Sequence, residues 1–237
     1  MSAQTILGQQ FRLSLANGLL QQQENLISSA VYQGYKFGIL ANYDRPLPNN
    51  RTLVLSGTMS ASISSWNQFN NELFQLDGSG HIAYLLPVKS FWQVGPTAKA
   101  RYQKNLYSLD YGHPFWFTQY SLGVFNRLSY PITKKNRIAA NFAIPLIGLY
   151  TSTPDEPLYD LKQEYTQTFH HNNLQVATLA NFRALDLQIS ISHELSKKKT
   201  VELGYAFNSF RYQNNKVLKS ITNSFIIGLQ FNFPNEK

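Results

Sequence analysis

The residue types best suited to chemistry gather in one polar stretch between positions 151 and 173. This stretch carries several carboxylates and two adjacent histidines: Asp155, Glu156, Asp160, Glu164, His170 and His171. A carboxylate that orients a histidine can activate a nucleophile, and the same groups can ligate a divalent cation. Their spacing matches no known ligand motif, and a merely solvated acidic loop is the simpler interpretation. We therefore keep Asp155, Glu156, His170 and His171 as an alternative catalytic set and expect no metal or cofactor.

A second group of suitable residue types is the tripeptide Ser192-His193-Glu194. Successive residues of a β-strand point to opposite faces, so these three side chains cannot form a relay if the segment is a strand. We expect His193 to be interfacial, and His81 and His113 to lie at loop–strand borders. The chain has no cysteine, which excludes disulfides and thiolate metal sites. No glycine-rich phosphate loop, zinc spacing or dinucleotide fingerprint is present.

The elements that position these residues are predicted by strict alternation, which is clearest between Thr52 and Ser64. One face of this run is polar and small: Thr52, Val54, Ser56, Thr58, Ser60, Ser62 and Ser64. The other face is apolar: Leu53, Leu55, Gly57, Met59, Ala61 and Ile63. Alternation over this length predicts a β-strand. Small hydroxyls on one face suit a strand with lipid outside and a narrow lumen inside, or a soluble sandwich with an exposed Ser/Thr face.

The composition favours the membrane interpretation. Only 14% of the 237 residues are charged, against about 25% in ordinary soluble domains, and the chain contains 16 Phe, 14 Tyr and 3 Trp. No stretch approaches the roughly 18 apolar residues of a membrane helix. A soluble barrel with its apolar face inward would carry charges on its outer face, and these strands do not.

Turns alternate in length along the chain. Five segments run into short turns or the chain end: 35–46, 82–86, 119–130, 185–194 and 225–233. Five others run away from them: 10–20, 51–64, 92–106, 137–149 and 200–212. The connections at the opposite end are longer: 21–33, 65–80, 107–118, 151–173 and 213–220. We therefore predict one all-β domain over 1–237, a single antiparallel transmembrane β-barrel of about ten strands. Eight to twelve strands are allowed, since 175–194 is long enough to contain a bend.

Aromatic residues near the strand ends add an expected interfacial girdle: Tyr43, Trp66, Tyr84, Trp92, Trp116, Tyr130, Tyr150 and Tyr212. On these features the chain resembles a small Gram-negative outer-membrane β-barrel over nearly its whole length. The segment 225–233 is similar to the C-terminal signal that the barrel-assembly machinery recognises in that class, an alternating strand closed by an aromatic. The chain departs from that signal by adding Pro234-Asn235-Glu236-Lys237 after Phe233. The resemblance implies short periplasmic turns, long extracellular loops and residence in a bacterial outer membrane.

Alternation also predicts which charged side chains enter the lumen. These are Arg12, Lys36, Asp44, Lys99, Arg101, Arg127, Asp186 and Glu202. A ten-stranded barrel is only slightly wider than the eight-stranded barrels that side chains can fill. The set is therefore interpreted as an ion-pair network that plugs the lumen. The alternative is a narrow, weakly anion-preferring pore in which Lys99, Arg101 and Arg127 set the field.

Expected partners follow from the remaining charges and aromatic residues. Net charge is +8, with basic clusters at 134–137 and 197–199 between strands. We interpret them as turns near anionic lipid, including lipopolysaccharide, rather than nucleic-acid sites. Aromatic residues in the long connections suit a protein or glycan partner, or fold back over the barrel mouth. The first residues contain no export signal, so we expect a mature chain. We predict a non-enzymatic monomer, or a subunit of a larger envelope complex, that acts as a narrow channel or a structural and docking component; the alternative is an outer-membrane hydrolase of lipid or peptide.

Overall fold

The computed structural model describes residues 8–24, 31–66, 71–108, 110–152, 174–213 and 217–233. Within them the chain is almost entirely β-strand, with one short 3-10 turn, η1 (Pro48–Asn50). The strands are β1 (Gln9–Glu24), β2 (Val31–Leu47), β3 (Arg51–Trp66), β4 (Asn71–Lys89), β5 (Trp92–Tyr107), β6 (Asp110–Pro131), β7 (Asn136–Ser152), β8 (Gln175–Thr178), β9 (Phe182–Ser196), β10 (Lys199–Gln213) and β11 (Val217–Phe233). In the described part of the chain no helix is long and apolar enough to cross a membrane.

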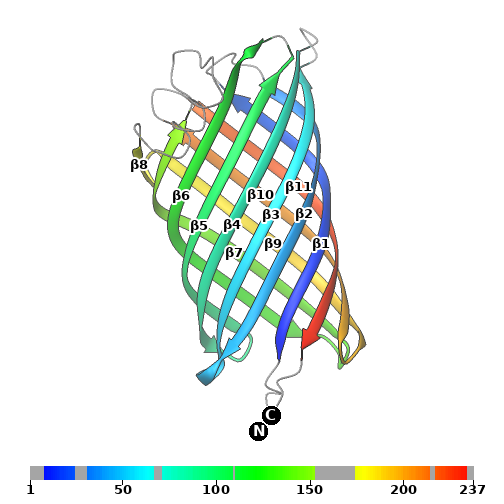
Figure 1. Cartoon of the computed structure of the whole chain (residues 1–237). Coiled ribbons are helices and arrows are strands. Elements are labelled where there is room, and N and C mark those ends of the chain that lie inside the picture. Colours follow the sequence, from blue (N-terminus) through cyan, green and yellow to red (C-terminus); the bar gives the residue numbers. More distant parts are fainter. Residues whose placement is uncertain are drawn as a thin grey trace.

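The strands form one closed antiparallel barrel. Each long strand pairs with its neighbours in the sequence, and β1 also pairs with β11, which joins the two ends of the sheet. The strands are tilted relative to the barrel axis, as closure requires, and β1 begins and β11 ends at the same end of the barrel (Figure 1). We call this end the turn end and the opposite end the loop end. At the turn end β2 passes to β3 through η1, where Asn49 and Asn50 adopt φ of 60° and 58°, the left-handed region that Asn tolerates.

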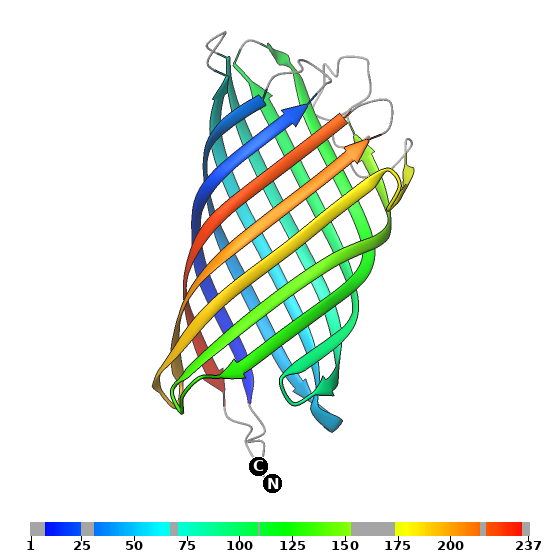
Figure 2. The ribbon, with the colours of Figure 1, turned by 180° about the vertical axis from the view of Figure 1, so that it is seen from behind.

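The wall contains a single interrupted strand between β7 and β10. β8 and β9 both pair with β7, β8 with residues Ile147–Tyr150 and β9 with residues Asn136–Ala143. The turn at 179–181 separates them, so together they fill one position of a ten-stranded barrel (Figure 2). The expected strand count is therefore confirmed, and the bend allowed within 175–194 is the turn at 179–181.

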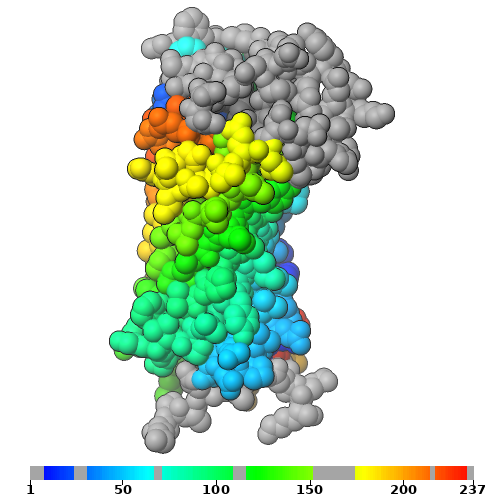
Figure 3. All heavy atoms as spheres, turned by 90° about the vertical axis from the view of Figure 1, so that its left-hand side faces the viewer, coloured from blue at the N-terminus to red at the C-terminus, as the bar shows by residue number. Residues whose placement is uncertain are grey.

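Because successive side chains of a strand point to opposite faces, the barrel wall has an inner and an outer surface of different composition. On β3, Val54, Ser62 and Ser64 are buried inside, whereas Met59 and Ile63 are 76% and 62% exposed outside. The same outward exposure of large apolar side chains recurs on the other long strands except β5, whose exposed residues are Pro96 and Ala100. A continuous apolar exterior over a small-residue interior is the arrangement of a barrel that is solvated by lipid. From the side, the chain runs in oblique bands along a barrel that is longer than it is wide (Figure 3).

The strands extend further towards the loop end than predicted. Most of the expected loop 65–80 belongs to β3 and β4, and most of 107–118 belongs to β6. Asp77-Gly78-Ser79-Gly80 has the composition of a turn, but its residues are held in β4 by pairing with β3 and β5. Pairing on both sides overrides weak intrinsic strand propensity.

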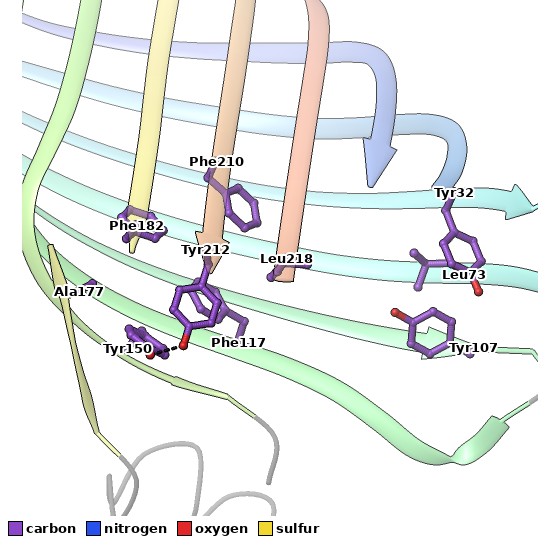
Figure 4. Close-up of a cluster of buried hydrophobic side chains, with 10 residues drawn as sticks. All are labelled: Tyr32, Leu73, Tyr107, Phe117, Tyr150, Ala177, Phe182, Phe210, Tyr212 and Leu218. Atoms are coloured by element: carbon purple, nitrogen blue, oxygen red, sulfur yellow. Dashed lines mark hydrogen bonds between the residues drawn. The ribbon is translucent and has the colours of Figure 1, made fainter. Parts of the chain in front are cut away.

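An aromatic cluster occupies the lumen at the loop end. It comprises Tyr32, Leu73, Tyr107, Phe117, Tyr150, Ala177, Phe182, Phe210, Tyr212 and Leu218 (Figure 4). The ring of Phe117 stacks on Phe210 with centroids 6.1 Å apart, and the hydroxyl of Tyr212 donates to that of Tyr150. The expected girdle is therefore wrong for Tyr150 and Tyr212, which point inward and are buried. Trp116 is also buried, whereas Tyr130 at the turn end is 62% exposed.

Candidate functional site in the lumen

The lumen between the aromatic cluster and the turn end holds the predicted charged residues. All but one of them line an internal cavity of about 190 Å³: Arg12, Lys36, Asp44, Lys99, Arg101, Arg127 and Asp186. Glu202 is buried and pairs with Arg12. Asp77 and His81, which alternation over shorter predicted strands did not assign to the lumen, line the same cavity.

Asp77 on β4 is the centre of a three-residue ion cluster. Its carboxylate accepts from Lys36 Nζ on β2 at 2.9 Å and from Arg101 Nη2 on β5 at 2.6 Å. The Arg101 guanidinium also lies over the ring of Phe210, 4.2 Å from its centroid. The cluster thus joins the ionic middle of the lumen to the aromatic cluster. A buried carboxylate shared by two cations satisfies all three charges away from water.

Two further ion pairs cross the lumen between strands that do not neighbour each other. Arg127 on β6 donates from Nη1 and Nη2 to the two carboxylate oxygens of Asp44 on β2, at 2.8 and 3.2 Å. Lys99 on β5 meets Asp186 on β9 at 2.5 Å, and Asn208 donates to the second oxygen of Asp186. The bidentate Arg127–Asp44 contact has the stronger geometry of the two.

A further pair joins Arg12 on β1 to Glu202 on β10, with 2.8 Å between Nη1 and Oε2. Gln188 also donates to Glu202, and Arg12 donates to Gln230. Glu202 is only 1% exposed. A carboxylate buried this deeply requires its partners, because the desolvation of an unpaired charge is costly.

A layer of amide side chains lies between the ions and the aromatic cluster. Gln22 on β1 accepts from Gln75 on β4 and from Gln103 on β5, at 2.5 and 3.0 Å. Both donors also bond Asn105, and Arg101 donates to Gln103. These four amide side chains are at most 1% exposed. β1 lies far from β5 in the sheet order, so this layer bridges opposite sides of the barrel.

In chemical terms the middle of the lumen is a polar core whose charges largely cancel. Five cations meet four carboxylates in these ion pairs, an excess of one positive charge. The cavity beside them is large enough for roughly ten water molecules or a small anion. Within the described ranges, no group of three or more His, Cys, Asp or Glu side chains is placed to hold a metal ion.

The candidate catalytic residues are only partly within reach of the structure. Asp155, Glu156, His170 and His171 lie outside the described residues, as does the side chain of His113. Ser192 and His193 diverge as expected: Ser192 donates to the Arg137 carbonyl, and His193 Nδ1 bonds Asn136 at the turn end. The border position expected for His81 is wrong. It lies within β4, its ring packs on Phe125, and its Nε2 is buried without a hydrogen bond.

The functional residues that sequence reasoning missed share one cause. Asp77, Gln75 and His81 lie within or beside the segment 65–80, which is predicted as a loop, so the predicted strands and their inward faces do not include them. Their period of two continues that of Ala83 and Leu85, which are buried. Extending the alternation backwards from 82–86 would have placed all three inside.

Comparison with known proteins identifies the fold. No protein-family model and no curated protein sequence matches this chain. Among solved structures, the chain is similar to the translocator domain of the autotransporter NalP from Neisseria meningitidis, at 10% identity and a TM-score of 0.59, over 98% of this chain and 90% of that one. It is also similar to the outer-membrane protease OmpT from Escherichia coli, at 10% identity and a TM-score of 0.54, over 98% of this chain and 99% of that one. The fold is that of an outer-membrane β-barrel.

Proposed function

We propose that this protein is an integral barrel of a bacterial outer membrane whose lumen is closed by its own side chains. In this proposal it acts as a structural and docking component of the envelope, not as a permanently open pore. The observation that carries the proposal is the set of contacts between opposite walls. Gln22 with Gln103, Arg127 with Asp44, and Lys99 with Asp186 each span the lumen.

Closure by these contacts is supported by their burial. The amide layer and the aromatic cluster are stacked along the lumen, and Leu73, Phe117, Gln22 and Gln103 have no measurable exposure. A hydrated ion would have to displace both layers. Each displaced amide would lose hydrogen bonds that water in a narrow space replaces poorly.

A narrow, weakly anion-preferring channel is the second candidate. The cavity lined by Lys99, Arg101 and Arg127, and the single excess positive charge of the paired ions, favour it. In this candidate the amide and aromatic layers form a gate, and Lys99, Arg101 and Arg127 set the field once the gate opens.

The test is ion conductance of the folded protein in a planar bilayer, with insertion checked by protease protection of the strands. We expect the inserted wild type to be silent. Two variants remove side chains from the closing layers: Gln22→Ala/Gln103→Ala, and the same double variant with Phe117→Ala added. Both should produce discrete current steps. Gln21→Ala, on the outer face beside Gln22, is the matched control and should stay silent. Anion-selective current steps from the wild type, with a conductance that changes in Lys99→Gln or Arg101→Gln, would contradict the closed barrel and support the channel.

The hydrolase alternative is tested separately. The OmpT neighbour is a protease, but at 10% identity it supports only the shared fold. Peptide or lipid hydrolysis by the wild type that disappears in His170→Ala or His171→Ala, with unfolding unchanged, would establish the alternative. Absence of hydrolysis in both wild type and variants agrees with the proposed non-enzymatic role.

A further inference from the structure

Three cations lie side by side on the outer surface of the barrel near the loop end. Arg211 on β10 is directly paired with Arg183 on β9 and with Lys219 on β11. All three belong to the outward set of their strands, and both arginines are exposed. We call Arg183, Arg211 and Lys219 the basic row. Figure 2 shows the segments that carry it where β9, β10 and β11 approach the loop end together.

Among the described residues, the contacts of the basic row involve no carboxylate. These contacts are to neutral groups: Arg183 donates to the carbonyl of Leu179, Arg211 to Gln213, and Lys219 to Gln23. In the described residues, the outward positions of β9, β10 and β11 contain no Asp or Glu. Like charges at directly opposite positions of neighbouring strands repel. An external anion would relieve this repulsion.

The basic row lies just beyond the upper edge of the apolar exterior. The next outward positions towards the turn end are Leu185, Ser209 and Ile221. Below them the exterior of these strands is apolar apart from Asn223, which accepts from the Tyr205 hydroxyl, and Phe225 and Ile227 are 74% and 63% exposed. This is the depth at which the headgroups of the surrounding lipids meet the barrel. The loop end of such a barrel faces the cell exterior, so these are headgroups of the outer leaflet.

The basic row is a patch and not part of a uniform ring. On the other side of the barrel, the paired outward residues at the same end of β2, β3 and β4 are Gln33, Ser65 and Glu72. These are neutral or acidic. A general attraction of the barrel to anionic lipid would not require the positive charges to gather on one side of the loop end.

We propose that the basic row binds the phosphate groups of a lipopolysaccharide molecule in the outer leaflet. The apolar surface of β9, β10 and β11 below it would receive the acyl chains. Neighbouring strands are about 4.8 Å apart, so the row spans roughly 10 Å. A headgroup with two phosphates on a disaccharide can contact all three cations, whereas a single phosphate reaches one or two. Guanidinium groups bind phosphate oxygens as a fork, which suits the two arginines. This inference rests on the proposed outer-membrane residence.

The test measures binding of bisphosphorylated lipid A to the detergent-folded full chain by its effect on the thermal unfolding midpoint over a range of lipid concentrations. Arg183→Gln/Arg211→Gln/Lys219→Gln should weaken the apparent affinity at least tenfold. Lys197→Gln/Lys198→Gln/Lys199→Gln removes the same number of positive charges at the turn end and should change the apparent affinity less than twofold. Phosphatidylglycerol, with one phosphate, should bind more weakly and respond less to the first triple substitution.

Two outcomes would overturn the inference. Equal weakening by both triple variants would indicate attraction by net charge alone. Equal binding of phosphatidylglycerol and lipid A, with equal losses in the first triple variant, would indicate a general anionic-lipid surface. Failure of the wild-type barrel to insert into a bilayer would instead contradict the proposed function, so the two failures are distinguishable.

Discussion

In the middle of the lumen charged side chains meet across the barrel, whereas at the loop end amide and aromatic side chains do so. Both regions lie inside the same barrel wall. The ionic region leaves a cavity beside its pairs, while the amide and aromatic layers bury their residues almost completely. Charge therefore holds particular strands in place at the centre, and close packing excludes water at the loop end.

The largest expected effect breaks the ionic region at Asp77. Asp77→Ala leaves Lys36 and Arg101 without their shared carboxylate, and we expect the free energy of unfolding in lipid vesicles to fall by roughly 3–5 kcal/mol. Glu72→Ala, an exposed acid on the same strand, should change it by less than about 0.5 kcal/mol. Equal effects of the two substitutions would show that the cluster adds nothing beyond charge number. Urea titration followed by tryptophan fluorescence measures both.

An intermediate effect is expected in the amide layer. Gln22→Leu removes the acceptor shared by Gln75 and Gln103, so that each donates only to Asn105 and has one buried N–H unpaired, at a cost of about 1–3 kcal/mol in the same titration. Gln21→Leu, which faces outward, is the control and should not destabilise the barrel. A Gln22→Leu barrel as stable as the wild type would mean that the layer tolerates unpaired amides.

A smaller effect is expected for the aromatic hydroxyls. Tyr150→Phe removes the group that accepts from Tyr212 and donates to Gln175, while the ring stays in place. We expect a loss of roughly 1 kcal/mol and no new conductance, because packing is preserved. Conductance steps in this variant would show that the hydroxyl chain, and not the rings, closes the loop end.

The smallest effect is expected for the Lys99–Asp186 ion pair. Lys99 and Asp186 are each about a quarter exposed, so water compensates part of a broken pair. Lys99→Met should cost roughly 0.5 kcal/mol, and Lys99→Met/Asp186→Leu should recover most of that loss. If the double variant is less stable than the single one, the pair contributes through its geometry and not only through its charge.

Sequence reasoning reached the barrel because alternation is a local property. The run 52–64 predicted β3 and its inner face, and the strand order followed from the short turns. It failed at 77–80 because Asp and Gly weaken the strand signal, although pairing with β3 and β5 keeps these residues in β4. It also misplaced Tyr150 and Tyr212, because position near a strand end does not say which face a ring occupies.

By itself the sequence determined the strands, the apolar exterior and eight of the charged residues that enter the lumen, since a period of two assigns each side chain to a face. The tertiary structure alone decided which charges meet. Arg127 finds Asp44, and Lys99 finds Asp186, across a lumen whose width and stagger depend on the register of every strand pair around the barrel. The basic row likewise depends on the registers of the β9–β10 and β10–β11 pairs, which place its three residues directly opposite one another. These are non-local relations, and no pattern within a single strand encodes them.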